Sequence, residues 1–375
     1  MIYLDYSATT KINSDVLDSY NKVCNEYIGN SNSLHSLGSK SLELLNSATS
    51  QIARLFNIKN NEIIYTSGAT EANNMALLCT CLENKRLGNE IIVSKLEHPS
   101  IYNICLYLET LGYKILYVNN DSDGLIDFED LKSKVNENTV MVSLCAVNSE
   151  LGIRQPLKTL RQIIKKENPN TIFHSDMTQA IGKVPVNFND VDLATISAHK
   201  FYGPKGIGML YKKESVHIKP LIYGGEKSDL RGGTPALPLI VAMAKALRIV
   251  LKDLNKNEEY VNKLNEKLVT FFSKYPNIMI NKSKYSIPHI FNISLMNIKS
   301  ETFIHALEKY EIYVGANTAC SKGKTSVAVY ALYNDEKRAN TTIRISLSYL
   351  TKVSELSEFM DKFDIEYKKL EDLVS

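Results

Sequence analysis

The sequence predicts an α/β protein in which helices cover a mostly parallel sheet, followed by a smaller α+β unit. Between residues 60 and 215, short β-rich runs alternate with helical patterns, and this alternation is typical of a parallel sheet. After residue 235 the pattern changes to two long amphipathic helices and then to further short strands. The length of 375 residues exceeds the size at which one hydrophobic core stops growing, so we expect two domains.

The elements of the first unit follow from these runs in chain order. The expected strands are Glu62–Ser67, Glu90–Ser94, Lys114–Val118, Val140–Val147, Thr171–Ser175, Leu193–Ser197 and Gly208–Tyr211. The expected helices between them include Glu71–Leu82, Ile101–Leu111 and Leu157–Lys166. Because ligands of such sheets bind beyond the carboxyl ends of the strands, reactive side chains should collect there.

The second unit begins near residue 255. Helices are expected over Ala236–Leu254, Glu258–Tyr275 and from Val353 to about Leu370, and strands over Ile287–Ser294, Glu311–Val314 and Thr342–Ser348. We therefore assign residues 13–255 to a large domain, and residues 1–12 and 256–375 to a small domain.

Composition excludes several classes of protein. Lys+Arg 44 against Asp+Glu 41 gives a net charge of +3, and the charges are interspersed, so direct nucleic-acid binding is not expected. The N-terminal stretch has no basic region and contains Asp5, and no apolar run is long enough to cross a bilayer, so neither a secretory signal nor a membrane span is expected. Six cysteines do not form a disulfide framework in a chain of this length. Those in apolar contexts indicate reduced core thiols, and hence the cytoplasm.

A lysine follows the strand that ends at Ser197. His199 and Lys200 stand at its carboxyl end, before the glycine-rich run Tyr202–Gly208. A lysine in this place suits a Schiff base with a cofactor aldehyde. Taken alone, such a lysine is far more often a solvated surface residue beside a turn.

A carboxylate and an amide follow another strand. Asp176 and Gln179 come directly after the buried pattern that starts at Thr171. A carboxylate against a pyridine nitrogen keeps that nitrogen protonated and makes the ring an electron sink. The alternative role of Asp176 is the N-cap of a following helix.

Two further strand ends carry candidates. The run Ile63–Glu71 turns at Gly68 into a helix, whose exposed N–H groups suit a phosphate, although a helix cap by Thr70 explains it equally. His98 follows the next strand and could stack on an aromatic cofactor or be a core histidine. The Gly-Lys-Thr-Ser run at 323–326 lacks the upstream glycine of a P-loop, so a nucleotide cradle is not expected.

Taken together, these segments resemble the class V aminotransferase group of pyridoxal-phosphate enzymes, and within it the cysteine desulfurases of the NifS/IscS kind. The resemblance extends from Tyr3–Thr10 to Ile343–Ser348 and includes the segments Thr66–Glu71, Ser197–Lys200, Arg231–Thr234 and Thr318–Ser321. It implies a large domain of pyridoxal-phosphate fold type I, similar to aspartate aminotransferase, and a small domain that carries a catalytic-cysteine loop.

The resemblance also implies a role for each matching residue. Lys200 would bind pyridoxal 5'-phosphate as a Schiff base, Asp176 would pair with the ring nitrogen, Gln179 would contact the phenolic oxygen and His98 would stack on the ring. The phosphate would be bound by Ala69, Thr70, Ser197 and His199, and by Thr234 from the other subunit of a homodimer. Asn148 lies in the family's cofactor-contacting Asn-Asn-Glu segment, in which Ser149 replaces the second Asn here. No metal is implied.

Two further residues are candidates for substrate binding and for the sulfur chemistry. Arg344 alternates with apolar Ile343 and Ile345 on an expected strand, and the resemblance directs it to the substrate carboxylate, a task that suits a planar guanidinium. Cys320 lies in a polar, small-residue stretch with Lys322 and Lys324 nearby, which favours a thiolate. The resemblance makes Cys320 the nucleophile that attacks the sulfur of bound cysteine.

The implied reaction converts L-cysteine to L-alanine and leaves a persulfide on Cys320. Lys200 would remove the α-proton, His98 would transfer protons, and an acceptor protein would take the sulfur for iron–sulfur cluster assembly or tRNA thiolation. A selenocysteine lyase, a class V aminotransferase and a catalytically idle sulfur-relay scaffold remain alternatives. The stretch 223–231 departs from the family's Gly-Gly-Gly-Gln-Glu pattern, which affects the expected phosphate and dimer contacts nearby.

Overall fold

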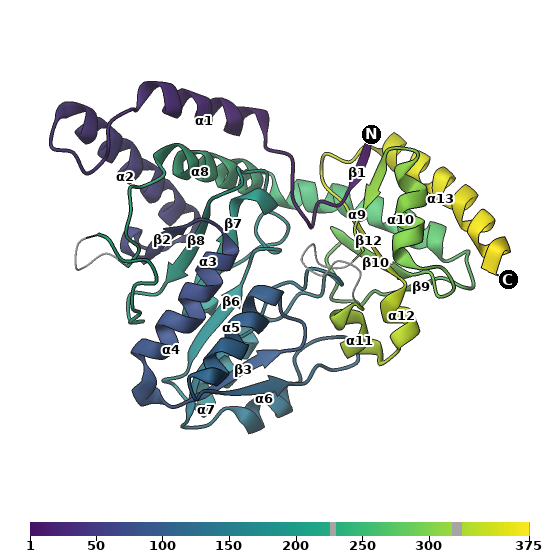
Figure 1. Cartoon of the computed structure of the whole chain (residues 1–375), viewed down its shortest axis with the longest axis horizontal. Helices are drawn as coiled ribbons and strands as arrows, with labels where there is room; N and C mark the ends of the chain where they lie inside the picture. The colour runs from purple at the N-terminus through teal and green to yellow at the C-terminus, as the bar shows by residue number, and fades with distance from the viewer. Residues whose placement is uncertain (226–229, 317–324, 375) are drawn as a thin grey trace.

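The larger part of the molecule is built on a seven-stranded sheet with the order β2-β8-β7-β6-β5-β3-β4 (Figure 1). The computed structural model describes residues 1–225, 230–316 and 325–374. The strands are β2 (Ile63–Thr66), β3 (Glu90–Ser94), β4 (Lys114–Val118), β5 (Thr139–Ser143), β6 (Ile172–Asp176), β7 (Leu193–Ser197) and β8 (Gly208–Lys212). All neighbours from β7 to β4 are parallel, and β8 is antiparallel to both β2 and β7. The predicted α/β class with a mostly parallel sheet is confirmed.

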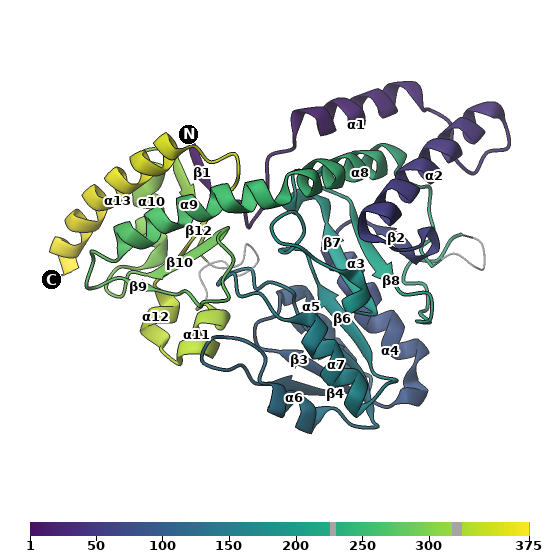
Figure 2. The same ribbon diagram turned by 180° about the vertical axis from the view of Figure 1, so that it is seen from behind.

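Helices cover both faces of this sheet (Figures 1 and 2). They are α1 (Ser14–Glu26), α2 (Ser36–Phe56), α3 (Ala69–Asn74), α4 (Thr80–Glu83), α5 (Pro99–Thr110), α6 (Phe128–Lys134), α7 (Leu157–Glu167) and α8 (Leu237–Lys252). A single π-helical turn, Met75–Cys79, joins α3 to α4. Side chains alternate along each strand: Ile91 and Val93 pack with α3 and α5, whereas Ile92 packs on the opposite face with α2, α7 and α8.

One predicted strand is shorter than expected. The run Val140–Val147 is a strand only as far as Ser143, where β5 ends. The N–H of Cys145 donates to the side chain of Glu97 at 3.0 Å instead of to a neighbouring strand. The segment therefore loses its pairing with β3 but stays beside β6, because the N–H groups of Leu144 and Ala146 donate to the carbonyls of His174 and Asp176 at 3.1 and 2.9 Å.

The smaller part has its own sheets and core. Its strands are β1 (Ile2–Leu4), β9 (Met279–Ile280), β10 (Ile290–Ser294), β11 (Ile312–Val314) and β12 (Thr342–Ser346), and its helices are α9 (Leu254–Phe272), α10 (Ser300–Glu308), α11 (Val327–Tyr333), α12 (Glu336–Asn340) and α13 (Val353–Val374). Strand β10 lies between β12 and β9, antiparallel to both. The aromatic rings of Phe272, Phe291, Phe303 and Phe363 pack together in the core beneath.

The N-terminal strand belongs spatially to this smaller part. Strand β1 pairs in parallel with β11, more than 300 residues further along the chain. Residues 5–13 then cross to α1 on the larger part (Figure 1). The backbone and hydroxyl of Thr10 both donate to the carbonyl of His199 at 2.9 Å, so this crossing segment lies against the end of β7.

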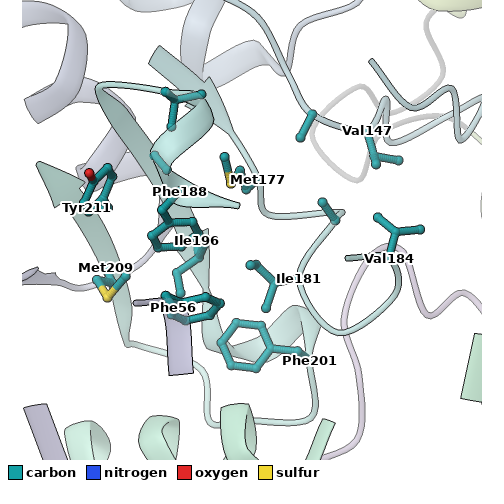
Figure 3. Close-up of a cluster of buried hydrophobic side chains, with 14 of the residues drawn as sticks. Phe56, Val147, Met177, Ile181, Val184, Phe188, Ile196, Phe201, Met209 and Tyr211 are labelled. Atoms are coloured by element: carbon teal, nitrogen blue, oxygen red, sulfur yellow. The ribbon is translucent and has the colours of Figure 1, made fainter. Parts of the chain in front are cut away.

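The core of the larger part extends up to the turn that follows β6. Met177, Ile181 and Val184 from this turn lie in the same cluster as Phe56 and Phe188 (Figure 3), whose rings stack with centroids 4.4 Å apart. These apolar side chains fix the turn to the sheet and thereby fix the polar residues between them.

Candidate active site

A cavity of about 520 Å³ opens where the parallel strands end. Three sources contribute to its walls: the strand ends of the large sheet, the crossing segment Ser7–Thr9, and Arg344 on β12. Nine of the residues singled out in the sequence line it: Ala69, Thr70, His98, Asp176, Gln179, Ser197, His199, Lys200 and Arg344. The cavity therefore brings together residues that are up to 337 positions apart in the chain, from Ser7 to Arg344.

Lys200 lies in a single helical turn after β7. Its Nζ donates to the carbonyl oxygens of Ser7 at 2.5 Å and Ala8 at 2.8 Å. The neighbouring His199 ring lies 3.1 Å from the hydroxyl of Thr9. Burial, reinforced by the charge of Lys200, lowers the pKa of His199 to about 4, so its ring is neutral at pH 7.

Asp176 ends β6, and both oxygens of its carboxylate are hydrogen-bonded. One accepts from the N–H of Thr178 and the other from the amide of Asn73, each at 2.9 Å. The first bond is of the kind expected for a helix cap, but residues 177–184 form turns and not a helix. Asn73 also donates to the hydroxyl of Ser100 at 2.8 Å. The carboxylate is thus fixed in position at the cavity wall.

His98 is connected to the same network. Its Nδ1 lies 2.8 Å from the hydroxyl of Ser100 and accepts from the Ser100 N–H at 3.1 Å, which makes His98 the N-cap of α5. Burial lowers the pKa of His98, an effect that the carboxylate of Asp176 opposes and the charge of Lys200 supports. The imidazole is therefore mainly neutral near pH 7.

The first residues of α3 line the cavity. Gly68 occupies the N-cap position and provides no side-chain cap, so the expected cap by Thr70 is absent. The first N–H groups of a helix have no partner within it, and here they belong to Ala69 and Thr70. A Cβ on Gly208 would lie only 2.7 Å from the Gly68 Cα, so the close approach of β8 to this turn requires glycine.

An ion pair supports this turn from outside. The carboxylate of Glu71 accepts from the N–H of Ser67 at 2.8 Å and from Nε of Arg231 at 3.1 Å. Its pKa is lowered: burial alone would raise it, but the hydrogen bonds from Ser67 and the charge of Arg231 outweigh burial. Arg231 thus offsets a negative charge next to the N–H groups of the turn.

Arg344 is 2% exposed and has two partners. Its Nη1 donates to the carbonyl of Ser149 at 3.0 Å and its Nη2 pairs with the carboxylate of Asp5 at 2.9 Å. Its Nε is buried with no partner among the described residues. Gly315 allows this packing, because a Cβ there would lie 2.6 Å from Asp5 Oδ1 and 3.0 Å from Nη2.

Two of the described residues singled out in the sequence, Asn148 and Thr234, lie elsewhere. The side chain of Asn148 binds backbone atoms of Leu96, Glu150 and Leu151, so it shapes the loop from which Ser149 lines the cavity. Thr234 lines a separate groove together with Tyr65. Cys320 lies outside the described residues. Of the residues flanking its segment, Gly315 pairs with Arg344 through backbone bonds of 3.0 and 2.7 Å.

Some residues at the site were not predicted from the sequence. Asp5, Ser7, Asn73 and Glu71 line the cavity or hold the residues that do. For three of them the sequence did contain a signal, because Asp5 and Ser7 belong to the segment Tyr3–Thr10 and Glu71 to the segment Thr66–Glu71, both of which carried the resemblance. Among the described residues there is no cluster of His, Cys, Asp or Glu that could bind a metal, and none of the helices is long and apolar enough to span a membrane.

Comparison with known proteins gives a consistent result. The family model described as aminotransferase class-V matches residues 2–359. A "NifS/IcsS protein homolog" from Lactobacillus delbrueckii subsp. bulgaricus is 37% identical, over 98% of this chain and 97% of that protein. A "cysteine desulfurase IscS" from Dictyoglomus turgidum is 32% identical over 98% of this chain and 95% of its own. A solved structure of a "NifS-like protein" superimposes with a TM-score of 0.93 at 33% identity, covering 98% of this chain and 99% of that one.

Proposed function

Because the chain belongs to the aminotransferase class-V family, we propose that it is a pyridoxal-phosphate-dependent cysteine desulfurase that converts L-cysteine to L-alanine and retains the sulfur as a persulfide on Cys320. The observation that carries this proposal is the single cavity that joins Lys200, Asp176, His98 and Arg344. The likeness along almost the whole chain to proteins named NifS and cysteine desulfurase supports the choice of reaction.

The residues of the cavity fit pyridoxal phosphate. The hydroxyls of Ser7 and Thr178 are buried in its wall without partners among the described residues, as expected of groups that await a polar ligand. The N–H groups of Ala69 and Thr70, with Ser197 and His199, would bind the phosphate. Bound at this site, the cofactor supplies an aldehyde for Lys200 and a ring that withdraws electrons from the substrate's α-carbon.

The residues around the cofactor would each have one task. Asp176, held by Asn73 and Thr178, would keep a proton on the ring nitrogen, and Gln179 would donate to the phenolic oxygen. Lys200, released when cysteine takes its place, would remove the α-proton. His98, neutral at pH 7 and in the same cavity, would stack on the ring and exchange protons with the substrate.

Arg344 would hold the substrate carboxylate. Its guanidinium is already oriented by Asp5 and the carbonyl of Ser149, and Nε remains as a donor without a described partner. Gly315, which lies against Arg344, precedes Cys320 by only five residues. An extended chain covers at most about 18 Å in that distance, so Cys320 can reach a cysteine bound at Arg344 and attack its sulfur.

We also propose that the active form is a homodimer with shared sites. Thr234, which the family resemblance assigns to the partner's phosphate, lies outside the cavity of its own chain. Around the connection between α1 and α2, Leu17, Ile28, Leu34 and Leu37 are exposed, which marks a surface suited to burial against a second copy.

The persulfide would pass to an acceptor protein of iron–sulfur assembly or of tRNA thiolation. We place the reaction in the cytoplasm, because the described cysteines Cys24, Cys79, Cys81, Cys105 and Cys145 are all free thiols, as in a reducing compartment.

The decisive experiment measures sulfide and alanine released from L-cysteine, with a reductant, by the wild type and by Cys320→Ala. We expect equal amounts of both products from the wild type and neither from the variant, whose bound-cofactor absorbance should persist. A wild type that retains the cofactor but forms neither product would contradict the proposal. Selenocysteine, amino-group acceptors and finally an activating partner would then be tested, since a lyase, an aminotransferase and an idle scaffold are the alternatives.

A further inference from the structure

Lys183 is a buried lysine for which the described part of the chain provides no counter-ion. It is 6% exposed and lies in the turn after β6, between Ile181 and Val184. The groups that shift its pKa are the cations Lys200 and Arg344, and none of them is acidic. Lysine is seldom buried without a partner because the cost of desolvation is large, so a specific role must favour it here.

The contact of Lys183 is with Gln179. Its Nζ donates to the Gln179 side-chain oxygen at 3.2 Å, while the Gln179 side-chain NH2 donates to the carbonyl of Ser7 at 2.9 Å. The same carbonyl accepts from Lys200 at 2.5 Å. A chain of contacts therefore runs from Lys183 through Gln179 and Ser7 to Lys200.

These partners decide which way the Gln179 amide points. A carbonyl oxygen can only accept and an ammonium group can only donate. Rotating the amide by 180° would place its oxygen against the Ser7 carbonyl and its NH2 against Lys183, and both contacts would then be repulsive. Lys183 thus holds the NH2 end towards Ser7, on the cavity wall.

The turn itself gives these groups little freedom. Met177, Ile181 and Val184 are buried in the core below it (Figure 3), and the N–H groups of Ala180 and Val184 donate within the turn at 2.9 and 3.0 Å. Because the backbone on either side of Lys183 is held and the side chain is buried, the amine has little room to leave Gln179.

Burial and the neighbouring charges affect the protonation of Lys183. Burial, reinforced by Lys200 and Arg344, lowers its pKa to about 7. From the smaller part, buried His289 is close enough for the charge of Lys183 to contribute to its own low pKa of about 3, so that ring is neutral. Both the charged and the neutral amine carry N–H groups, so the bond to Gln179 persists on either side of neutral pH.

We propose that Lys183 is a positioning residue that acts through Gln179: it fixes the amide so that a donor, and not an acceptor, faces the cofactor beside Lys200. This inference rests on the proposed function, because it presumes that the cavity binds pyridoxal phosphate. The donor would bind an oxygen of the cofactor, and that interaction is lost when the amide is free to rotate.

The test is a double-mutant cycle on the intact protein with Lys183→Met and Gln179→Ala. The readouts are the dissociation constant of pyridoxal phosphate and the pH midpoint of its bound-state absorbance, neither of which requires turnover. We expect each single variant to bind the cofactor about tenfold more weakly, the typical loss for one hydrogen bond, and to shift the midpoint. The double variant should bind no more weakly than Gln179→Ala alone.

Two further variants and the wild type complete the test. Lys212→Met removes another buried lysine, one that donates to the carbonyl of Val216 at 3.0 Å and does not line the cavity, and it should leave both readouts unchanged. Gln179→Glu keeps Lys183 but removes the side-chain donor, so it should weaken cofactor binding and shift the midpoint as Lys183→Met does. It also tests the proposal if Lys183→Met folds poorly. The proposal would be overturned if either Lys183→Met or Gln179→Glu kept the wild-type cofactor affinity and midpoint. It would also be overturned if the two losses of affinity multiplied in the double variant. A wild type that binds no pyridoxal phosphate would overturn the proposed function instead.

Discussion

At the scale of single residues, Arg344 shows how a charged side chain is prepared for its task. Burying a guanidinium is unfavourable unless its N–H groups are paired. Here Asp5 balances the charge and the carbonyl of Ser149 satisfies a second donor. The orientation of the remaining donor is therefore set in advance, which would lower the entropic cost of binding the proposed substrate carboxylate.

Arg344→Lys should consequently impair substrate binding and leave cofactor binding intact. Lysine preserves the charge next to Asp5 but cannot form two parallel bonds to a carboxylate. We expect the kcat/KM for L-cysteine to fall about 10- to 100-fold, mainly through KM, in line with the loss of one charged hydrogen bond. Steady-state kinetics, together with the absorbance of bound cofactor, provide the check. An unchanged KM would show that Arg344 does not bind the carboxylate.

Glu97 contributes a pH dependence to stability. Burial raises its pKa to about 7, whereas in the unfolded chain it stays near 4.5. The folded state therefore binds more protons between these values, so the contribution of Glu97 to stability is greatest below pH 4.5 and is lost as the pH rises to 7. Glu97→Gln should remove this loss, which amounts to no more than about 3 kcal/mol.

Urea unfolding at pH 5 and pH 8 measures this effect. The stability of Glu97→Gln relative to the wild type should be higher at pH 8 than at pH 5. Glu129→Gln is a suitable control, because that side chain is 86% exposed and should change stability equally little at both values. A difference for Glu97→Gln that does not vary with pH would contradict the raised pKa.

At the scale of elements, the limits of strands were predicted best where a short apolar run ends at polar residues. Strands β3, β4 and β7 have the predicted limits, because each is a compact apolar run bounded by polar residues. Helices α1 and α2 were not predicted, although α1 carries Val16, Tyr20 and Val23 at helical spacing with Asn13 as its cap. The many polar residues between them obscured the pattern.

The partners of the predicted site residues were harder to predict for a physical reason. A side chain such as Asp176 is identified by its own place at a strand end. Asn73 and Asp5, which orient Asp176 and Arg344, act across the fold and do not stand at a predicted strand end. Asp5 was indicated only by the family resemblance of its segment. Only the register of the sheets and the crossing of residues 5–13 bring them together.

The approach of β8 to the start of α3 provides a prediction at this scale. A Cβ on Gly208 would lie 2.7 Å from both the Gly68 Cα and the carbonyl oxygen of Ile196, and backbone atoms cannot move aside as a flexible side chain can. Gly208→Ala should therefore displace the turn that carries Ala69 and Thr70. We expect at least tenfold weaker cofactor binding and a loss of about 1–3 kcal/mol of stability.

Titration with pyridoxal phosphate measures the expected loss of cofactor affinity in Gly208→Ala, and urea unfolding measures the expected loss of stability. Gly112→Ala serves as the comparison: it has open space around the added methyl group but a φ of +88°, so it should lose stability through backbone strain alone. Cofactor affinity should be unaffected in that variant. Equal affinity in the two variants would show that the close contact at Gly208 does not shape the cofactor site.

At the scale of the whole molecule, the site depends on two separately built cores. Lys200 and Asp176 stand on the large sheet, Arg344 stands on β12 of the smaller part, and the crossing segment that starts in β1 contacts both. The hydroxyls of Tyr202 and Ser348 lie 2.6 Å apart across the same junction. The division into domains at residues 12 and 255 stays a prediction, but the proposed chemistry would require these two parts to be held in register.

The proposed homodimer extends this dependence to a second chain and can be tested by mixing inactive variants. Thr234→Asp would place a negative charge beside the partner's phosphate, and Lys200→Ala would remove the cofactor lysine, so each homodimer should be inactive. A mixed dimer would contain one intact site, formed by Lys200 of one chain and Thr234 of the other. Unfolding and refolding an equimolar mixture should therefore restore about a quarter of wild-type activity, because half of the dimers are mixed and each has one site. Mixtures that remain inactive, when Thr234→Ser alone is active, would show that Thr234 serves no site on a partner chain.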